Sequence, residues 1–314
     1  MRRDRGINRF VRLAVFAPAA VCLLTVISAS PSLPLQEDEG IMPAVYLNHL
    51  YIILDGEAYE AIASSEIIRN EFAGFEQATT QAGSGDSWTG TYIYGERTYI
   101  ELFEAADDDW GGPGDCGIAF CVEAEGGIQR VEAALNRKLG EGVVQPFLQT
   151  MATDEGEVPW FHVAQLVYGD GEENMGFSTW VMEYHPEFLS TMAPEMFPQP
   201  GAISRREGLQ RFFDPDKYLK EIVEIRMSLP LRRAETFFDE LAALGWRVEK
   251  QGSMTVCNGP EITITVESAE GSETGIREIG FSLLREKQGQ KVYEIGESSS
   301  LEFGDGLKAA WKFK

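Results

Sequence analysis

The chain has 314 residues, of which 44% are hydrophobic and 25% charged, a composition typical of folded globular proteins rather than disordered ones. Its formal net charge is −23 at pH 7, and because so acidic a surface repels phosphate backbones, we expect no nucleic-acid partner. The length suffices for one large domain or for two of ordinary size.

The first 30 residues have the pattern of a secretory signal peptide. MRRDRGINRFVR carries five arginines and one aspartate, and the apolar run LAVFAPAAVCLLTVISAS follows it and ends in small residues. This pattern predicts export to the periplasm or the extracellular space, with cleavage near Ser28 to Ser30. Loss of residues 1–28 would shift the net charge from −23 to −27. The alternative is an uncleaved membrane anchor, since the apolar run is almost long enough to span a bilayer.

A β-α-β-β-β unit opens the folded part. NHLYIILD predicts a strand, and GEAYEAIASSEIIRNEFAGF predicts a helix because its apolar residues recur at helical spacing. Three more strands, separated by glycine-rich turns, are predicted over EQATTQAG, SWTGTYIYG and TYIELFEA.

The same order of elements then recurs along the chain. The second unit is CGIAFCVE, the helix GGIQRVEAALNRKLG, and the strands GVVQPFLQTM, PWFHVAQLVYG and FSTWVMEYH. The third is EIVEIRMSLP, the helix LRRAETFFDELAALG, and the strands WRVEKQG, SMTVCNG and EITITVES. A last set, IREIGFSLLRE, KVYEIGES and LKAAWKF, predicts strands with no helix among them. Repetition of one supersecondary unit indicates a modular architecture.

The connection over residues 186–219 is rich in proline and methionine and is long for a compact domain. We expect it to cap a site or to join two domains. The cysteines of the mature part, Cys116, Cys121 and Cys257, predict no disulfide set. Five extended residues at roughly 3.3 Å each would place the first two sulfurs too far apart to bond.

Alternation along the predicted strands groups several polar and aromatic side chains. His49 shares a face of the first strand with Tyr51 and Ile53, and Glu101 lies on a face of the fourth strand with its neighbours two residues away.

The stretches LNHLYIILDGEAYEAI and YIELFEA resemble the first strand and helix, and the fourth strand, of the vicinal oxygen chelate superfamily. That group includes glyoxalase I, extradiol dioxygenases and the bleomycin- and fosfomycin-resistance proteins. The resemblance is clearest over residues 45–185 and is strongest to a bacterial glyoxalase-like branch with no settled reaction. It implies an α+β fold in which repeated β-α-β-β-β modules form curved mixed sheets around a cavity. It also implies a two-module domain over 45–185 and a second, degenerate domain over 220–314.

In this superfamily a histidine on the first strand and a glutamate on the fourth bind a divalent metal. The matching positions here are His49 and Glu101. In the second module Gly117 stands where the metal enzymes have a histidine, and the fourth strand offers Glu183, with His185 two residues on. The resemblance thus implies the metal ligands His49, Glu101 and Glu183, and His162 in the adjacent strand is a further candidate.

Two functional classes follow from the resemblance. One is an exported protein that binds a small oxygenated molecule in the cavity of its first domain, alone or through a divalent metal at His49 and Glu101. The other is a metal-dependent lyase, isomerase or dioxygenase. If the pair holds a metal, its donor atoms should lie roughly 3–4 Å apart.

Overall fold

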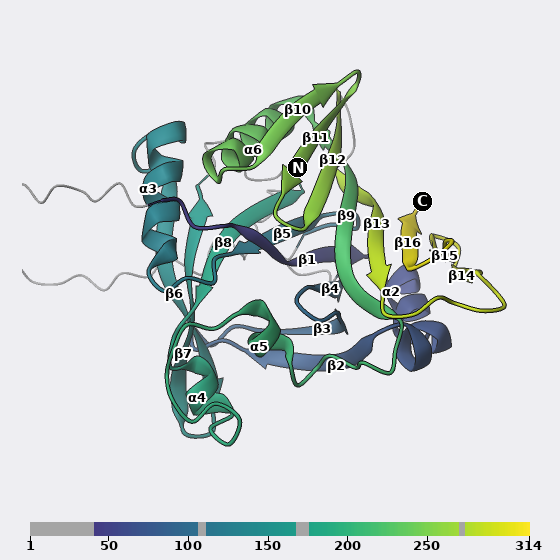
Figure 1. Ribbon diagram of the computed structural model, residues 1–314, viewed down its shortest axis with the longest axis horizontal. Coiled ribbons are helices and arrows are strands. Elements are labelled where there is room, and N and C mark those ends of the chain that lie inside the picture. Colours follow the sequence, from purple (N-terminus) through teal and green to yellow (C-terminus); the bar gives the residue numbers. More distant parts are fainter. Residues whose placement is uncertain (1–40, 106–110, 168–175, 270–273) are drawn as a thin grey trace, which may run out of the picture.

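The computed structural model describes residues 41–105, 111–167, 176–269 and 274–314, so the predicted signal peptide lies outside the described residues. The chain forms two eight-stranded sheets, one after the other (Figure 1). The first sheet contains β1 (Tyr46–Leu54), β2 (Gly74–Gln81), β3 (Ser87–Tyr94), β4 (Tyr99–Glu104), β5 (Cys116–Cys121), β6 (Val144–Thr153), β7 (Gly156–Leu166) and β8 (Phe177–Tyr184). The second contains β9 (Leu219–Pro230), β10 (Arg247–Gln251), β11 (Met254–Gly259), β12 (Ile262–Ala269), β13 (Gly275–Leu283), β14 (Val292–Ile295), β15 (Ser299–Phe303) and β16 (Lys308–Phe313).

Both sheets have the strand order that a pair of β-α-β-β-β modules produces. The first runs β2-β3-β4-β1-β5-β8-β7-β6, and the second runs β10-β11-β12-β9-β13-β16-β15-β14. In the first sheet β1 is parallel to β4 and β5 is parallel to β8, and the two modules meet where β1 and β5 pair antiparallel. The predicted fold class, α+β with repeated modules in curved mixed sheets, is confirmed.

The last module differs from the other three in strand direction. Its first and fourth strands, β13 and β16, pair antiparallel, whereas β9 and β12 pair parallel. Parallel neighbours require a crossover connection, which is usually a helix. In the described part of the chain no helix lies between β13 and β14. The chain therefore reverses directly, as expected for a last set of strands that lacks a helix.

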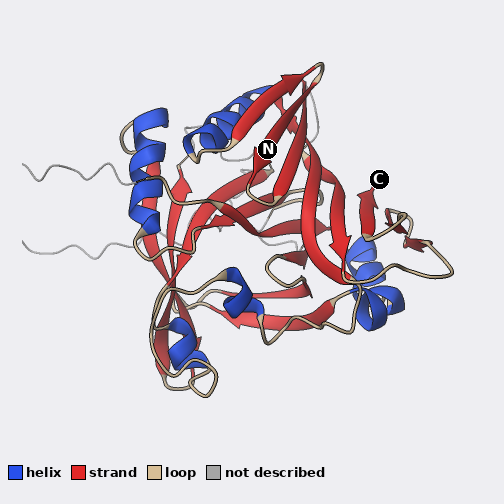
Figure 2. Ribbon diagram, viewed as in Figure 1, coloured by secondary structure: helices blue, strands red, loops and turns tan. Residues whose placement is uncertain are grey.

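In each of the first three modules, a helical segment follows the first strand (Figure 2). These segments are α2 (Gly56–Ala63), the π-helix η1 (Ile67–Phe72), α3 (Gly127–Leu139) and α6 (Leu231–Ala243). The single helix predicted over 56–75 is thus two helices. α2 ends where the Ser64 hydroxyl donates to the Glu60 carbonyl, a local bond that competes with the helical ladder. No helix in the described residues is both long and apolar enough to span a membrane.

One hydrophobic core runs through both sheets. It includes Phe72 of η1, whose ring packs edge-on against Phe281 of β13 at 5.2 Å between centroids. Phe120 of β5 packs in the same manner against Trp246 of the second sheet at 5.2 Å. The two predicted domains therefore share buried surface, and their division into 45–185 and 220–314 stays a prediction. The predicted absence of a disulfide accords with three free, buried cysteines, Cys116, Cys121 and Cys257.

The first sheet curves until its two edge strands meet. Beyond β2, Ala82 forms an isolated antiparallel bridge with Met151 of β6, and the Gly83 amide donates to the Thr150 carbonyl at 3.1 Å. The inner face of the sheet is thereby enclosed on two sides. The edges of the second sheet, β10 and β14, do not pair with each other.

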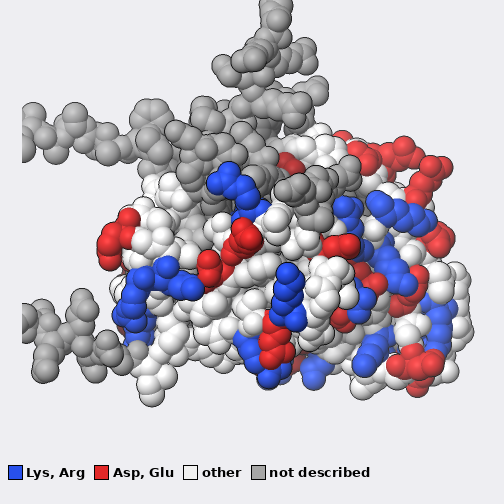
Figure 3. Space-filling view, turned by 90° about the horizontal axis from the view of Figure 1, so that it is seen from above, with Lys and Arg blue, Asp and Glu red and all other residues white. Residues whose placement is uncertain are grey.

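Charged side chains of both signs lie next to one another on part of the surface. Figure 3 shows acidic and basic groups interspersed on the face that it presents. On the second sheet, for example, Arg226 pairs with Glu224 at 2.8 Å. Such a mixture of charges is typical of a solvent-exposed face, and the face in Figure 3 has no extended basic patch.

Candidate functional site

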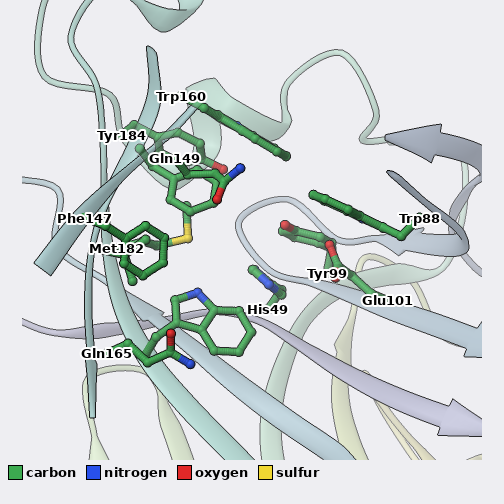
Figure 4. A pocket seen from close by; sticks show the side chains of 13 residues that line it. His49, Trp88, Tyr99, Glu101, Phe147, Gln149, Trp160, Gln165, Met182 and Tyr184 are labelled. Carbon is green, nitrogen blue, oxygen red and sulfur yellow. The ribbon is translucent and has the colours of Figure 1, made fainter. Parts of the chain in front are cut away.

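A cavity lies against one face of the first sheet, called here the inner face. This inner cavity measures about 80 Å³ and has mostly aromatic and aliphatic walls (Figure 4). It is lined by His49, Trp88, Tyr99, Glu101, Phe147, Gln149, Trp160, Phe161, Val163, Gln165, Trp180, Met182 and Tyr184. Side chains two residues apart, such as Trp180 and Met182, line it together because alternate residues of a strand face the same side.

A second, larger cavity continues from the first. This outer cavity measures about 560 Å³ and shares several walls with the inner one, among them Trp88, Glu101 and Trp160. Its cover comes from the connection between the sheets, through α4 (Phe188–Met192) and α5 (Arg205–Leu209). The structure thus places this connection over the inner face.

A β-bulge in β1 sets the position of His49. The register between β1 and β5 shifts between the pairs Leu47↔Phe120 and His49↔Ala119, so Asn48 is an extra residue. A bulge of this kind turns two successive side chains toward one side of the sheet and re-aims them. Asn48 accordingly lies beside Cys121 and Tyr184, on the same side as His49.

The Asn48 side chain fixes the protonation of the His49 ring. The distance from His49 Nδ1 to Asn48 Oδ1 is 2.8 Å. With the Asn48 amide in this orientation its oxygen accepts, so Nδ1 carries the proton and Nε2 keeps its lone pair. Burial lowers the pKa of His49 to about 3, which keeps the ring neutral. Tyr99 stacks on this ring at 4.5 Å between centroids, and Trp180 contacts it edge-on at 5.4 Å. His49 is therefore a rigidly held acceptor.

Glu101 is the acidic group of the inner cavity. Its side chain is half-buried, and the accessible part faces the cavity. Burial raises the pKa of Glu101 to about 8, and the Tyr99 hydroxyl opposes this rise by favouring the ionised form. The ionised carboxylate is costly here unless a positive charge lies beside it.

The second module supplies no counterparts to these two residues. Across the β1–β5 pair, His49 lies opposite Ala119. His49 pairs with Tyr99, two residues before Glu101, and Ala119 pairs with Trp180, two residues before Met182. Ala119 and Met182 therefore occupy the positions equivalent to His49 and Glu101. Neither side chain can provide a nitrogen or oxygen ligand.

The resemblance aligned Gly117 with the histidine of the metal enzymes, but in the structure Gly117 lies opposite Tyr51 and serves packing. A Cβ atom at this position would lie 2.2 Å from Cε1 of Tyr51, so the tyrosine ring occupies the space of a side chain. The Tyr51 hydroxyl reaches Ser178 Oγ at 2.8 Å. A larger residue at position 117 would have to displace this buried ring.

The structure does not bring Glu183 to the cavity, contrary to the implied ligand set. Trp180, Met182 and Tyr184 face inward, so Glu183 points to the opposite side of β8. Its oxygens accept hydrogen bonds from the amides of Gly126 and Ile128, at 2.8 and 2.7 Å, where α3 begins. Glu183 thus caps a helix.

The remaining two histidines also lie outside the inner cavity. His162 of β7 pairs in register with Glu183, and its ring centroid lies 5.6 Å from that of His185. Within the described residues, no three His, Cys, Asp or Glu side chains come close enough together to hold a metal ion. His49 and Glu101 alone are two donors, whereas protein sites for zinc or iron have three or four. The donor set therefore does not fit a resident metal ion.

One family model matches nearly the whole described chain. This is DUF5829, a family of unknown function, and the match covers residues 47–313. The chain belongs to this family. The DUF5829 match runs from β1 to β16 and so includes both sheets and the cavities of the first. No curated protein matches the chain.

Several solved structures are similar to this DUF5829 chain at low identity. A hypothetical protein from Staphylococcus aureus has 13% identity and a TM-score of 0.48, with 81% of this chain and 95% of that one covered. The Mn(II)-bound glyoxalase from Novosphingobium aromaticivorans has 13% identity and a TM-score of 0.40, with 76% and 65% covered. A putative dioxygenase from Bacillus subtilis subsp. subtilis str. 168 has 12% identity and a TM-score of 0.29, with 76% and 70% covered.

Sequence reasoning missed part of the DUF5829 cavity. Nothing in the sequence indicates that Asn48 faces the same side as His49, because the bulge that turns it inward has no sequence signature. Gln149 and Gln165 are isolated polar residues in strands, and Trp88 stands next to a turn. Met182 could have been found, because strand alternation links it to Trp180.

The capping role of Glu183 leads to a stability prediction. Glu183→Ala should lower the free energy of unfolding by about 1–3 kcal/mol, since it leaves two amides at the start of α3 without their acceptor. Urea denaturation monitored by circular dichroism measures this. Glu187→Ala, an exposed glutamate four residues on, is the matched control and should have little effect. Equal stability of the two variants would contradict the capping role.

Proposed function

We propose that the chain is an exported protein that binds a small oxygen-bearing molecule in the inner cavity, without a resident metal ion. One observation carries this proposal: a neutral imidazole with a free acceptor nitrogen and a carboxyl group share a cavity whose walls are otherwise mostly aromatic and aliphatic. The signal-peptide pattern of residues 1–30 supports export.

The composition of the cavity supports binding of a flat molecule. Small-molecule sites are usually apolar clefts with a few polar groups that fix orientation. His49 supplies an acceptor, and the side-chain amides of Gln149 and Gln165 supply further donors and acceptors. The tryptophan and phenylalanine rings supply apolar area on which an aromatic ligand can stack.

Filling the cavity should abolish binding. We expect 2-naphthol, a flat neutral probe with one hydroxyl group, to bind the wild-type protein, as measured by isothermal titration calorimetry. Met182→Trp places a large ring in the cavity and should weaken binding about tenfold or more, a loss of about 1.4 kcal/mol or more. Leu148→Trp adds the same ring at an exposed position of β6 and should bind like the wild type. Equal affinities for all three proteins would exclude this cavity as the site.

A metal-dependent lyase, isomerase or dioxygenase is the second candidate. The observation that favours it is the lone pair on Nε2 of His49 in the cavity that also contains Glu101. These two residues are the donors that this cavity offers to a divalent metal.

Metal analysis separates the two candidates. After mild dialysis without added metal, the purified wild-type protein should contain no stoichiometric divalent metal, because two donors retain an ion poorly. His49→Ala should have the same metal content. Stoichiometric metal in the wild type that is lost in His49→Ala would contradict a metal-free site and favour the second candidate.

A further inference from the structure

The acidic group of the inner cavity has no basic partner there. Among the described residues that line this cavity, none is a lysine or an arginine. Arg211 lines only the outer cavity, where its guanidinium lies 4.5 Å above the Phe212 ring. A carboxylate withdrawn from bulk water is costly to keep charged unless a positive group approaches it. The space beside Glu101 therefore favours a cation over an anion.

Aromatic rings surround the same space. Trp88, Trp160 and Trp180 line the inner cavity with Tyr99, and Figure 4 shows Trp88 and Tyr99 near Glu101, with Trp160 farther away. The face of an aromatic ring attracts a cation within about 6 Å, most strongly for tryptophan, and sets of such rings recognise quaternary ammonium groups. A cavity that three tryptophans and one carboxyl group line together thus has the chemistry of a cation site.

Packing behind the rings holds two of them in place. Trp160 contacts Phe161 edge-on at 4.8 Å and stacks on Phe188 of α4 at 5.9 Å. Trp180 stacks on Tyr51 at 6.1 Å. Rings fixed before a ligand arrives lose little conformational freedom when it binds.

The volumes of the two cavities suit a ligand with a small head and a larger body. One water molecule needs about 10–15 Å³ of such space, so the inner cavity, at about 80 Å³, accommodates a group of a few heavy atoms. The outer cavity, at about 560 Å³, offers room for the rest of the molecule under α4 and α5.

We propose that the inner cavity binds the positively charged head of an organic cation, an amine or quaternary ammonium group, between the tryptophan rings and the Glu101 carboxylate. This inference rests on the proposed binding of a small molecule in this cavity and names the class of that molecule. The net charge of −23 raises the local concentration of cations near the protein and so favours the same class.

Two probes of equal shape test the proposal. Phenyltrimethylammonium carries a permanent positive charge, and tert-butylbenzene is its neutral counterpart. The wild-type protein should bind the cation about tenfold more tightly, or better, as measured by quenching of tryptophan fluorescence. Equal affinities would overturn the cation proposal and leave the binding cavity intact. Binding of neither probe would overturn the cation proposal, and the 2-naphthol titration decides the proposed binding cavity separately.

A matched pair of variants then locates the charge. Glu101→Gln should remove most of the preference for the cation while leaving the affinity for tert-butylbenzene nearly unchanged. Glu76→Gln makes the same change in the outer cavity, where Glu76 accepts a hydrogen bond from the Tyr94 hydroxyl, and it should retain the preference. Loss of the preference in Glu76→Gln but not in Glu101→Gln would place the cation in the outer cavity and contradict the proposal.

Discussion

Phe72→Ala should lower the free energy of unfolding by about 3–5 kcal/mol, the usual cost of deleting a fully buried aromatic ring. Phe72 ends the π-helix η1 and is 0% exposed. Its ring packs edge-on against Phe281 and Phe303, at 5.2 and 6.0 Å, so it joins a helix of the first module to two strands of the second sheet. The cavity left by alanine would therefore weaken both sheets.

Hydrogen–deuterium exchange with peptide mass analysis reports on each sheet separately. In Phe72→Ala, amides of β1 and β4 should lose protection together with those of β13 and β16, because one core supports both sheets. Leu148→Ala, at a side chain that is 43% exposed, is the control and should change protection little. Loss of protection confined to the second sheet would support two independent domains over 45–185 and 220–314.

Arg205→Met should lower the free energy of unfolding by about 2–3 kcal/mol. It should also loosen the connection with α4 and α5 that covers the cavities. Arg205 begins α5, and its side chain is 4% exposed. The guanidinium donates to Glu123 at 2.9 Å, to the Leu47 carbonyl at 3.0 Å and to Glu261 at 2.8 Å. Loss of one partner from a buried ion pair costs about 3–5 kcal/mol, and less here because both carboxylates remain partly solvated.

This arginine connects three parts of the molecule. Glu123 follows β5 of the first sheet, Glu261 belongs to the β11–β12 turn of the second, and Arg205 itself belongs to the covering connection. Glu261 has a φ of 68°, a conformation that non-glycine residues seldom adopt. Its side chain also pairs with Arg97 at 2.6 Å, so the turn directs one carboxylate at two arginines. The second sheet thus helps to hold the cover over the cavity of the first.

Acrylamide quenching of tryptophan fluorescence and urea denaturation measure the two effects. Arg205→Met should show faster quenching than the wild type under native conditions, because Trp160 packs under the cover. Arg206→Met is the matched control: its side chain is 70% exposed and its ion pair with Glu96 should contribute less than about 1 kcal/mol. If the two variants behaved alike, Arg205 would not be the link between the sheets and the cover.

The repeated order of elements made the fold predictable. Helical spacing and glycine-rich turns gave three β-α-β-β-β modules, and the missing last helix explains why β16 runs antiparallel to β13. The strand β15 was not predicted, since it begins in a run of serines with weak strand preference. The break between α2 and η1 was missed as well, because helical spacing continues across it.

The candidate site was predictable only in its first module. Alternation correctly placed Tyr51 and Ile53 on one face of the first strand, where both pack with Phe103 of β4. It could not decide which face of β8 lines the cavity, because nearly every residue of FSTWVMEY is buried and the strand lacks a polar side. Glu183 was therefore placed on the wrong side. The inward orientation of Asn48 depends on a β-bulge, and this bulge arises from the pairing of β1 with β5, which is distant in the sequence.

The contrast between closed and open sheet edges bears on self-association. The edges of the first sheet meet through Ala82 and Met151, whereas β10 of the second sheet leaves one row of backbone groups unpaired with any strand in the described chain. Such a row can template the addition of a strand from another molecule. This short strand carries three charged residues, Arg247, Glu249 and Lys250. A second copy that paired with β10 would have to place like charges next to each other or bury them. Charges at this edge therefore disfavour the addition of a strand to β10.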